Sequence, residues 1–348
     1  MGTKSDFKVF QTAAGDRIYR LTLEAFYEFW TFVYLIVINR KEHGKYTVLI
    51  DSGSGYGRSN QDLAEGLARA ADHETSFRGL EDISHILISH AHVDHFGGLP
   101  FLRAHCGGKI GVHGLSVPIV TRYDQHVAGV SRRLLPYLQQ AGLDGSEVET
   151  LIHIHQASQL TYANTGVDFT FEEAGIDLGP IKVHHVPAHC PGHALFQLDE
   201  VLLCGDHLLP GISPHQGPEC LLLNSGLGHY LESLQSTKKW AGQIHLTLPG
   251  HEGEIFNISR RITEIEELHR TRFRQVMAYL ETPHTVKDTA HNLFGEVHGY
   301  QGYNRLLALE EAGAHIEYLV LRGLIHIDNF SDVQAAHEPI PIYYRTTF

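Results

Sequence analysis

"SHAHVDHFGGLP", residues Ser89–Pro100, places three histidines and one aspartate within six positions. It follows an apolar run, ISHILI, that has the composition of a β-strand. Alternate side chains on extended backbone point the same way, so His90 and His92 are expected on one side. A following turn then directs Asp94 and His95 elsewhere. Since imidazole and carboxylate groups bind zinc, and also iron or manganese, the stretch predicts one metal position for each pair.

Further candidate ligands lie in loops that follow predicted strands later in the chain. The motifs are VPAHCPGH (186–193), LLCGDHLLPGISP (202–214) and LTLPGHEGEI (246–255). A rigid sheet whose strands end on polar loops can hold side chains from distant parts of the chain in one site. A chance cluster is the alternative, because the chain contains 27 histidines. Four motifs in chain order favour a metal site over chance.

The composition restricts the classes of function. The 348 residues include 27 basic and 40 acidic ones, and the formal net charge of −13 argues against binding nucleic acid or anionic membrane through a basic field. The four cysteines show no CxxC spacing, and the first residues contain no apolar segment of the signal-peptide type. The most apolar stretch, Ala25–Arg40, carries Glu28 and is rich in β-branched and aromatic residues, which favours buried strands over a membrane span. We therefore expect a cytoplasmic protein with reduced thiols and no membrane partner.

Three other features have both a structural and a functional interpretation. GSGYG (53–57) lacks the spacing and the lysine of a nucleotide-binding loop, so a tight turn beside the metal edge is favoured. His153 and His155 lie in a helix-rich segment, where side chains two positions apart point about 200° apart, which favours surface or pocket histidines over a ligand pair. For Cys190 and Cys204, small buried thiols are as good an interpretation as a redox role.

The four motifs together resemble those of the metallo-β-lactamase superfamily, in the branch similar to glyoxalase II with dinuclear sites. The HxHxDH signature of that family corresponds to residues 90–95, and VPAHCPGH resembles its third-histidine motif, with Cys190 where threonine or serine is usual. LCGD and LPGH resemble the motifs that supply a bridging carboxylate and the last ligand. LIDSG, with Asp51, resembles the structural aspartate loop in the first half of that fold. The resemblance covers about residues 20–255.

This resemblance implies an α/β fold, an αββα sandwich, with two divalent metal ions at one edge of its two sheets. By carry-over, the first ion is held by His90, His92 and His189. The second ion is held by Asp94, His95 and His251, with Asp206 bridging the two ions. Zinc is the expected metal, with iron or manganese as alternatives. The implied nucleophile is a hydroxide between the ions, with Asp94 as the catalytic residue that orients it and accepts its proton.

Two histidines next to these ligands are further candidates. His193 is the last residue of the third-histidine motif and His207 follows the bridging aspartate directly. Both are expected either to contact substrate or to support the ligands, with plain packing as the alternative.

The chain is predicted to contain two domains. Residues 1–258 form the catalytic domain, with a helical insertion at about 114–162 that lies between the sheet halves and covers the mouth of the site. Residues 259–348 combine three predicted helices with two short strands, a winged-helix pattern in which Thr285 and Asp288 cap one helix and Gly323 ends another. GDHLLPGISP, HYLESL and this pattern resemble one sub-branch of lactamase-like hydrolases, whose members include an endoribonuclease.

The expected function is hydrolysis of a small ester, thioester or lactone by a dinuclear metal centre. The alternative is a metal-dependent endoribonuclease or phosphodiesterase that acts on single-stranded RNA. A metal-holding module that binds nucleic acid and regulates is a third, less favoured hypothesis. Acidic residues outnumber basic ones between Ser259 and Ser331, which disfavours RNA and favours a wall for the cleft as the role of the C-terminal part. A small molecule is the expected partner, and the oligomeric state is left open, with a homodimer as the candidate assembly.

Overall fold

A computed structural model describes residues 7–41, 44–158, 162–173, 178–296 and 299–347 of the chain. The chain divides into two compact units. The first unit consists of residues 1–123, 162–214 and 234–262, and the second of residues 124–161, 215–233 and 263–348. The division at residue 259 into two domains that fold independently stays a prediction.

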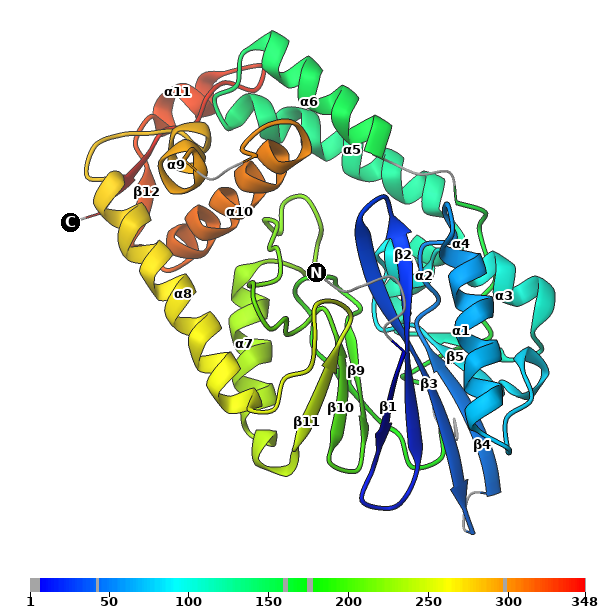
Figure 1. Ribbon diagram of the computed structural model, residues 1–348. Helices are drawn as coiled ribbons and strands as arrows, with labels where there is room; N and C mark the ends of the chain where they lie inside the picture. The colour runs from blue at the N-terminus through cyan, green and yellow to red at the C-terminus, as the bar shows by residue number, and fades with distance from the viewer. Residues whose placement is uncertain (1–6, 42–43, 159–161, 174–177, 297–298, 348) are drawn as a thin grey trace. The chain divides into compact units, whose positions relative to one another are not determined.

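The first unit is built on two β-sheets (Figure 1). The first sheet has the order β1-β2-β3-β4-β5-β6-β7 and consists of β1 (Lys8–Gln11), β2 (Arg17–Phe26), β3 (Phe29–Arg40), β4 (Gly44–Ile50), β5 (His85–Leu87), β6 (Lys109–Val112) and β7 (Phe169–Thr170). Its first four strands are antiparallel and its last three join in parallel. The second sheet has the order β11-β10-β9-β8 and consists of β8 (Lys182–His185), β9 (Ala194–Leu198), β10 (Val201–Gly205) and β11 (Leu246–Pro249).

Alternation along the long strands explains why the two sheets pack face to face. In β3, Tyr34, Ile36 and Ile38 point into one core, where they meet residues of the second sheet such as Phe196 and Leu203. All five side chains are almost fully buried. Successive residues of a strand face opposite sides of the sheet, so the continuous apolar run of β3 places apolar side chains on both faces. This is expected for a sheet that is covered on each side.

Helices cover the outer face of the first sheet. They are α1 (Ser59–His73), α2 (Val93–Phe96), α3 (Leu99–His105) and α4 (Val117–Thr121), with short 3₁₀ turns at Leu80–Asp82 and Gly114–Ser116. Helix α1 packs on β2, where Gly66 allows the helix to approach Leu21 closely. The end of α7 (Leu227–Lys238) and the following turn at Ala241–Gln243 lie against the second sheet, where His184 of β8 stacks on Trp240. The unit is therefore an αββα sandwich, as predicted.

The second unit is mainly helical. Its elements are α5 (Tyr123–Gln140), α6 (Gly145–Ser158), α9 (Val286–Phe294), α10 (Gly302–Leu321), β12 (Ile325–Ile327), α11 (Phe330–Ala335) and β13 (Tyr344–Thr346), and α7 (Leu227–Lys238) and α8 (Ile258–Tyr279) each contribute part of their length. Leu138 and Leu151 of the predicted insertion share one apolar core with Val276 and Leu309 of the C-terminal part. This common core explains why the two segments form one unit.

The sequence located the insertion correctly as helical, but its place in the sheet differs from the prediction. It lies between β6 and β7, which pair in parallel within the first sheet, and not between the two sheet halves. The reason is that β7 is only two residues long and follows a long loop, so its pairing gives no periodic signal in the sequence. That the insertion covers the mouth of the site stays a prediction.

The predicted signals at the helix ends of the C-terminal part are confirmed. Thr285 accepts a hydrogen bond from the Asp288 backbone N–H and Asp288 accepts one from the Thr285 backbone N–H, so both sides of the capping box are present. Helix α10 ends just before Gly323, which has a φ of 68°. Strands β12 and β13 pair antiparallel as predicted. The elements of a winged helix are therefore present, and their identification as a winged helix stays a proposal.

Among the described residues, no helix is long and apolar enough to cross a membrane. The apolar stretch Ala25–Arg40 forms the end of β2 and all of β3.

Candidate metal centre

The loop after β5 carries the first four predicted ligands. His92 lies on extended backbone, and His90 Nε2 and His92 Nδ1 are 3.1 Å apart. The chain then turns into the short helix α2, which carries Asp94 and His95. The separation into two pairs that the sequence predicted is therefore present, and the turn that carries the second pair is a short helix of its own.

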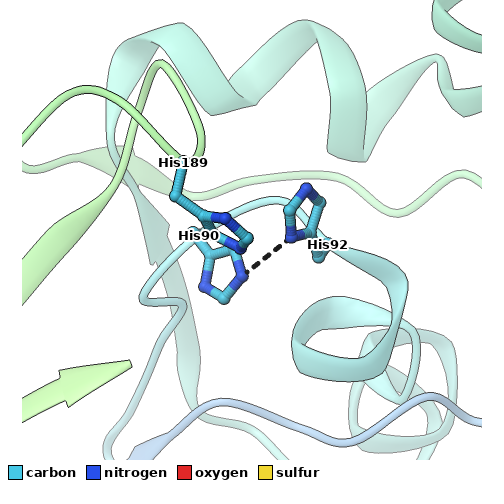
Figure 2. Close-up of side chains that lie close together, drawn as sticks. All are labelled: His90, His92 and His189. Atoms are coloured by element: carbon cyan, nitrogen blue, oxygen red, sulfur yellow. Dashed lines mark hydrogen bonds between the residues drawn. The ribbon is translucent and has the colours of Figure 1, made fainter. Parts of the chain in front are cut away.

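The structure brings all seven predicted ligands together at one end of the two sheets. His90, His92 and His189 form one group whose nitrogen atoms lie within 4.8 Å of one another (Figure 2). Asp94, His95 and His251 form a second group of the same size, in which His95 Nε2 and His251 Nε2 are 3.3 Å apart. These two triads are the sets that the resemblance implied for the two ions.

Asp206 lies between the two triads. One of its oxygens, Oδ2, is 3.7 Å from His189 Nε2 and 3.3 Å from His251 Nε2. The other, Oδ1, is 3.6 Å from His95 Nε2. Oδ2 therefore lies close to a nitrogen of each triad, which is the position that a bridging carboxylate needs.

A buried hydrogen-bond network holds the ligands from behind. The Asp51 carboxylate accepts hydrogen bonds from the Ser89 backbone N–H at 2.7 Å and from the Ser89 hydroxyl at 2.8 Å. Its Oδ2 also lies 2.9 Å from His95 Nδ1, and the Ser89 hydroxyl is 3.0 Å from His90 Nδ1. On the second triad, His251 Nδ1 is 2.7 Å from the carbonyl oxygen of Trp30. These contacts orient each imidazole so that Nε2 faces the centre.

Sequence reasoning missed two members of this network. Ser89 stands at the start of the quoted motif, where its position before His90 was a usable signal. Trp30 acts through its backbone carbonyl and lies 221 positions from His251, so no local pattern in the sequence indicates it.

Glycines allow the loops of the site to approach one another. A Cβ on Gly250 would lie 2.5 Å from Asp206 Oδ1, and one on Gly97 would lie 2.0 Å from the carbonyl oxygen of Ser54. In the GSGYG segment, Gly53, Gly55 and Gly57 all have positive φ, which agrees with the predicted tight turn. A Cβ on Gly55 would come within 2.3 Å of the Gly97 carbonyl oxygen, so this turn packs directly on the ligand loop.

Two histidines of the first triad are held in the neutral form. Burial lowers the pKa of His90 well below its usual value, and neighbouring imidazoles add to the effect. Burial likewise lowers the pKa of His92 to about 3, with His189 contributing. Metal ligands must present an unprotonated nitrogen, so these two side chains are in the required state at neutral pH.

The second triad and Asp206 hold opposite charges close together. Burial by itself would raise the pKa of Asp94 and Asp206, but the positively charged His95 and His251 lower both below the usual range. Burial would also lower the pKa of the two histidines, yet the carboxylates raise both, and that of His251 reaches about 10. Protons therefore occupy this side of the site when no cation does.

The residues fit a pair of metal ions on three grounds. The donor set consists of imidazole and carboxylate groups that zinc, iron and manganese all accept. Asp206 Oδ1 is buried and accepts no hydrogen bond within the described part of the chain, an arrangement that a cation would satisfy. Finally, His92, Asp94 and His189 are only half-buried whereas His90 and His95 are fully enclosed, so the site is accessible from one side.

His193 and His207 both lie behind the ligands and are about 1% exposed. The His193 ring stacks on that of His90, and its Nε2 accepts a hydrogen bond from the Asp206 backbone N–H at 3.1 Å. His207 Nε2 is 2.9 Å from the Thr237 hydroxyl. Of the two predicted roles, these contacts favour support of the ligands, and contact with substrate stays a prediction.

The two cysteines beside the ligands are also enclosed. Burial raises the pKa of the Cys190 thiol to about 12 and that of Cys204 further. Thiols in this state are weak nucleophiles, which favours the packing interpretation. In the helical insertion, His155 is buried in α6 while His153 is exposed, as the helical spacing predicted.

Comparison with known proteins agrees with this geometry. Residues 30–251 match the Metallo-beta-lactamase superfamily. The chain is 27% identical over 242 residues to the lactamase-like protein adaB of Aspergillus niger, a match that covers 68% of this chain and 56% of that protein. The chain therefore spans little more than half the length of this curated relative.

Two solved structures are similar over nearly the whole chain. A metallo-beta-lactamase family protein from Thermus thermophilus is 22% identical, with a TM-score of 0.69, and the match covers 94% of this chain and 98% of that one. A beta-lactamase domain protein from Burkholderia ambifaria is 20% identical, with a TM-score of 0.74, and the match covers 98% of this chain and 94% of that one. At this level of identity the likeness shows a common fold.

Proposed function

The chain belongs to the metallo-β-lactamase superfamily, and from that premise we propose that it is a dinuclear, zinc-dependent hydrolase of a small ester, thioester or lactone. The observation that carries the proposal is the pair of ligand triads with Asp206 between them. Each triad brings three donor atoms within 4.8 Å of one another, and the Asp206 carboxylate lies close to nitrogens of both triads.

The bound ions would supply a hydroxide at neutral pH and polarise the oxygen of the scissile group. His90, His92 and His189 would hold one ion, and Asp94, His95 and His251 the other. Asp206, 7% exposed, would hold the two groups at a fixed separation.

Asp94 is the proposed proton acceptor. Its Oδ2 is 3.2 Å from His251 Nε2 and 3.4 Å from His95 Nε2, so its orientation is set by two neighbours. It is half-buried, which leaves the carboxylate accessible from the open side of the site. A water molecule that attacks from that side can pass its proton to Asp94.

An apolar surface beside the second triad supports an acyl substrate. The Phe29 ring lies 4.9 Å from the His251 ring and Phe29 is 44% exposed. Phe26 packs on Phe29 and also contacts Tyr56, which is itself exposed. Apolar side chains at the edge of a polar centre suit an acyl chain better than a polyanion. The net charge of −13 works in the same direction.

A metal-dependent ribonuclease is the second candidate. The helices α8, α9 and α10 followed by the β12–β13 pair support the proposal of a winged helix, a module that often binds nucleic acid. The excess of acidic residues in that part opposes it. A regulatory module that holds metal without catalysis is less favoured, because a complete hydrolytic ligand set would then serve no reaction.

The deciding experiment compares substrates on metal-loaded protein: an acylglutathione, an acyl-CoA, a lactone, a phosphodiester reporter and single-stranded RNA. We expect acyl turnover with a kcat/KM of about 10⁴ M⁻¹s⁻¹ or more, the lower end for a physiological substrate. Efficient RNA cleavage with negligible acyl turnover would establish the second candidate instead.

The matched variants are Asp206→Ala, which removes the bridging carboxylate, and Asp199→Ala, which removes an aspartate that pairs with Arg40 away from the centre. We expect the first variant alone to lose metal and activity while keeping its circular dichroism spectrum. Full turnover and the metal content of the unmodified protein in Asp206→Ala would show that the bridge is assigned to the wrong residue.

A further inference from the structure

A second group of buried ligand-type side chains lies within the second unit and shares no residue with the metal centre. It consists of His269 on α8 and of Glu311 and His315 on α10. Both histidines are fully buried and Glu311 is 6% exposed. One nitrogen or oxygen atom from each residue lies within 4.8 Å of the other two.

The spacing of the two imidazoles matches that of a metal-ligand pair. His269 Nδ1 and His315 Nε2 are 3.1 Å apart, the same separation as between His90 Nε2 and His92 Nδ1 in the first centre. Two nitrogens that bind one tetrahedral zinc at about 2.0–2.1 Å lie about 3.3 Å apart. A small outward shift therefore places both nitrogens at bonding distance from one ion.

The atoms behind these side chains are arranged as they are behind ligands. His315 Nδ1 is 2.7 Å from the carbonyl oxygen of Glu311, a contact in which Nδ1 donates its hydrogen and leaves the Nε2 lone pair pointing at His269. Glu311 Oε1 accepts a hydrogen bond from Arg272 at 2.8 Å, and Oε2 accepts one from the Gln216 backbone N–H at 2.8 Å. Since each carboxylate oxygen has two lone pairs, both oxygens keep one for a cation.

Neither imidazole carries a positive charge. Burial lowers the pKa of His269 to about 2, with His315 and Arg272 adding to the effect. Burial also lowers the pKa of His315. The pair is therefore neutral at physiological pH, and a single hydrogen, the one that His269 Nδ1 donates to His315 Nε2, has to leave before an ion binds both nitrogens.

From this geometry we propose that His269, Glu311 and His315 form a second metal site, which binds one divalent ion of the zinc type. Two imidazoles and one carboxylate are a donor set that suits zinc. Because all three side chains are enclosed, the ion has no open side for a substrate, and its role is to cross-link α8 to α10 within the second unit. The proposal does not depend on the function assigned to the first centre.

The test counts metal ions. Protein stripped with a chelator is dialysed against excess Zn²⁺ and then against metal-free buffer, and bound zinc is measured by mass spectrometry. We expect three ions per chain for the unmodified protein and two for His269→Gln and Glu311→Gln. His326→Ala, which removes an exposed histidine of the same unit, should keep three.

A second measurement applies even where a buried substitution prevents folding. The double variant His92→Ala with Asp206→Ala disables the first centre and leaves the second unit unchanged. It should keep one ion per chain and give the absorption bands of tetrahedral Co²⁺ when cobalt replaces zinc. Two ions in the unmodified protein, or none in this double variant, would show that the cluster is a metal-free hydrogen-bond network and would overturn the proposal.

Discussion

Replacing Asp51 with alanine should lower the stability of the loops that carry the metal ligands more than it changes the catalytic step. Asp51 is 2% exposed, and its carboxylate accepts hydrogen bonds from the backbone and hydroxyl of Ser89 and faces His95 Nδ1 at 2.9 Å. Alanine leaves these three buried donors without an acceptor. At about 1–1.5 kcal/mol for each hydrogen bond, the free energy of unfolding should fall by roughly 3–5 kcal/mol.

The assay is urea unfolding of the chelator-treated protein, so that bound metal does not contribute to stability. Asp168→Ala is the control, because Asp168 accepts hydrogen bonds from Arg103 and from the Ile110 backbone but lies partly in solvent and outside the centre. Its loss should cost less stability and leave metal binding unchanged. An Asp51→Ala protein with normal unfolding free energy and abolished turnover would refute the reasoning, since Asp51 would then act in catalysis.

Three further changes have defined outcomes. Gly250→Ala should reduce the zinc content and turnover together, because the new methyl group would lie 2.5 Å from Asp206 Oδ1; unchanged zinc content would show that the loop can move aside. In the metal-free protein the pKa of His251 is raised to about 10, so its proton stabilises the fold fully below about pH 6.5, the usual value for histidine. That contribution should be lost as the pH rises through about 10, and urea unfolding of chelated protein at several pH values measures it, with His251→Gln expected to lose this part of the pH dependence. Thr285→Ala removes half of a capping box and should cost about 1 kcal/mol of stability without a change in turnover, whereas an equal loss of activity would contradict a purely structural role.

The sequence was sufficient for the ligands of the first centre and for most of the strands that carry them. His90, Asp206 and His251 each follow an apolar strand and His189 follows the short strand β8, so residue type and position both indicate them. The capping pair and the Gly323 stop were predictable for the same reason, because caps depend on residues within one turn of a helix. Contacts such as helix caps can be predicted from the sequence because the interacting residues are neighbours in the chain.

What only the tertiary structure decided is how distant residues meet. The Asp51–His95 contact joins positions 44 apart, the Trp30 carbonyl reaches His251 across 221, and the facing nitrogens of His269 and His315 come from positions 46 apart on different helices. The second unit likewise exists because Leu138 and Leu309 share a core, although 171 positions separate them. Hydrogen bonds and apolar contacts of this kind depend on how sheets and helices pack. Packing brings together elements that are far apart in the chain, and the periodicity within a single element does not indicate which other element it will contact.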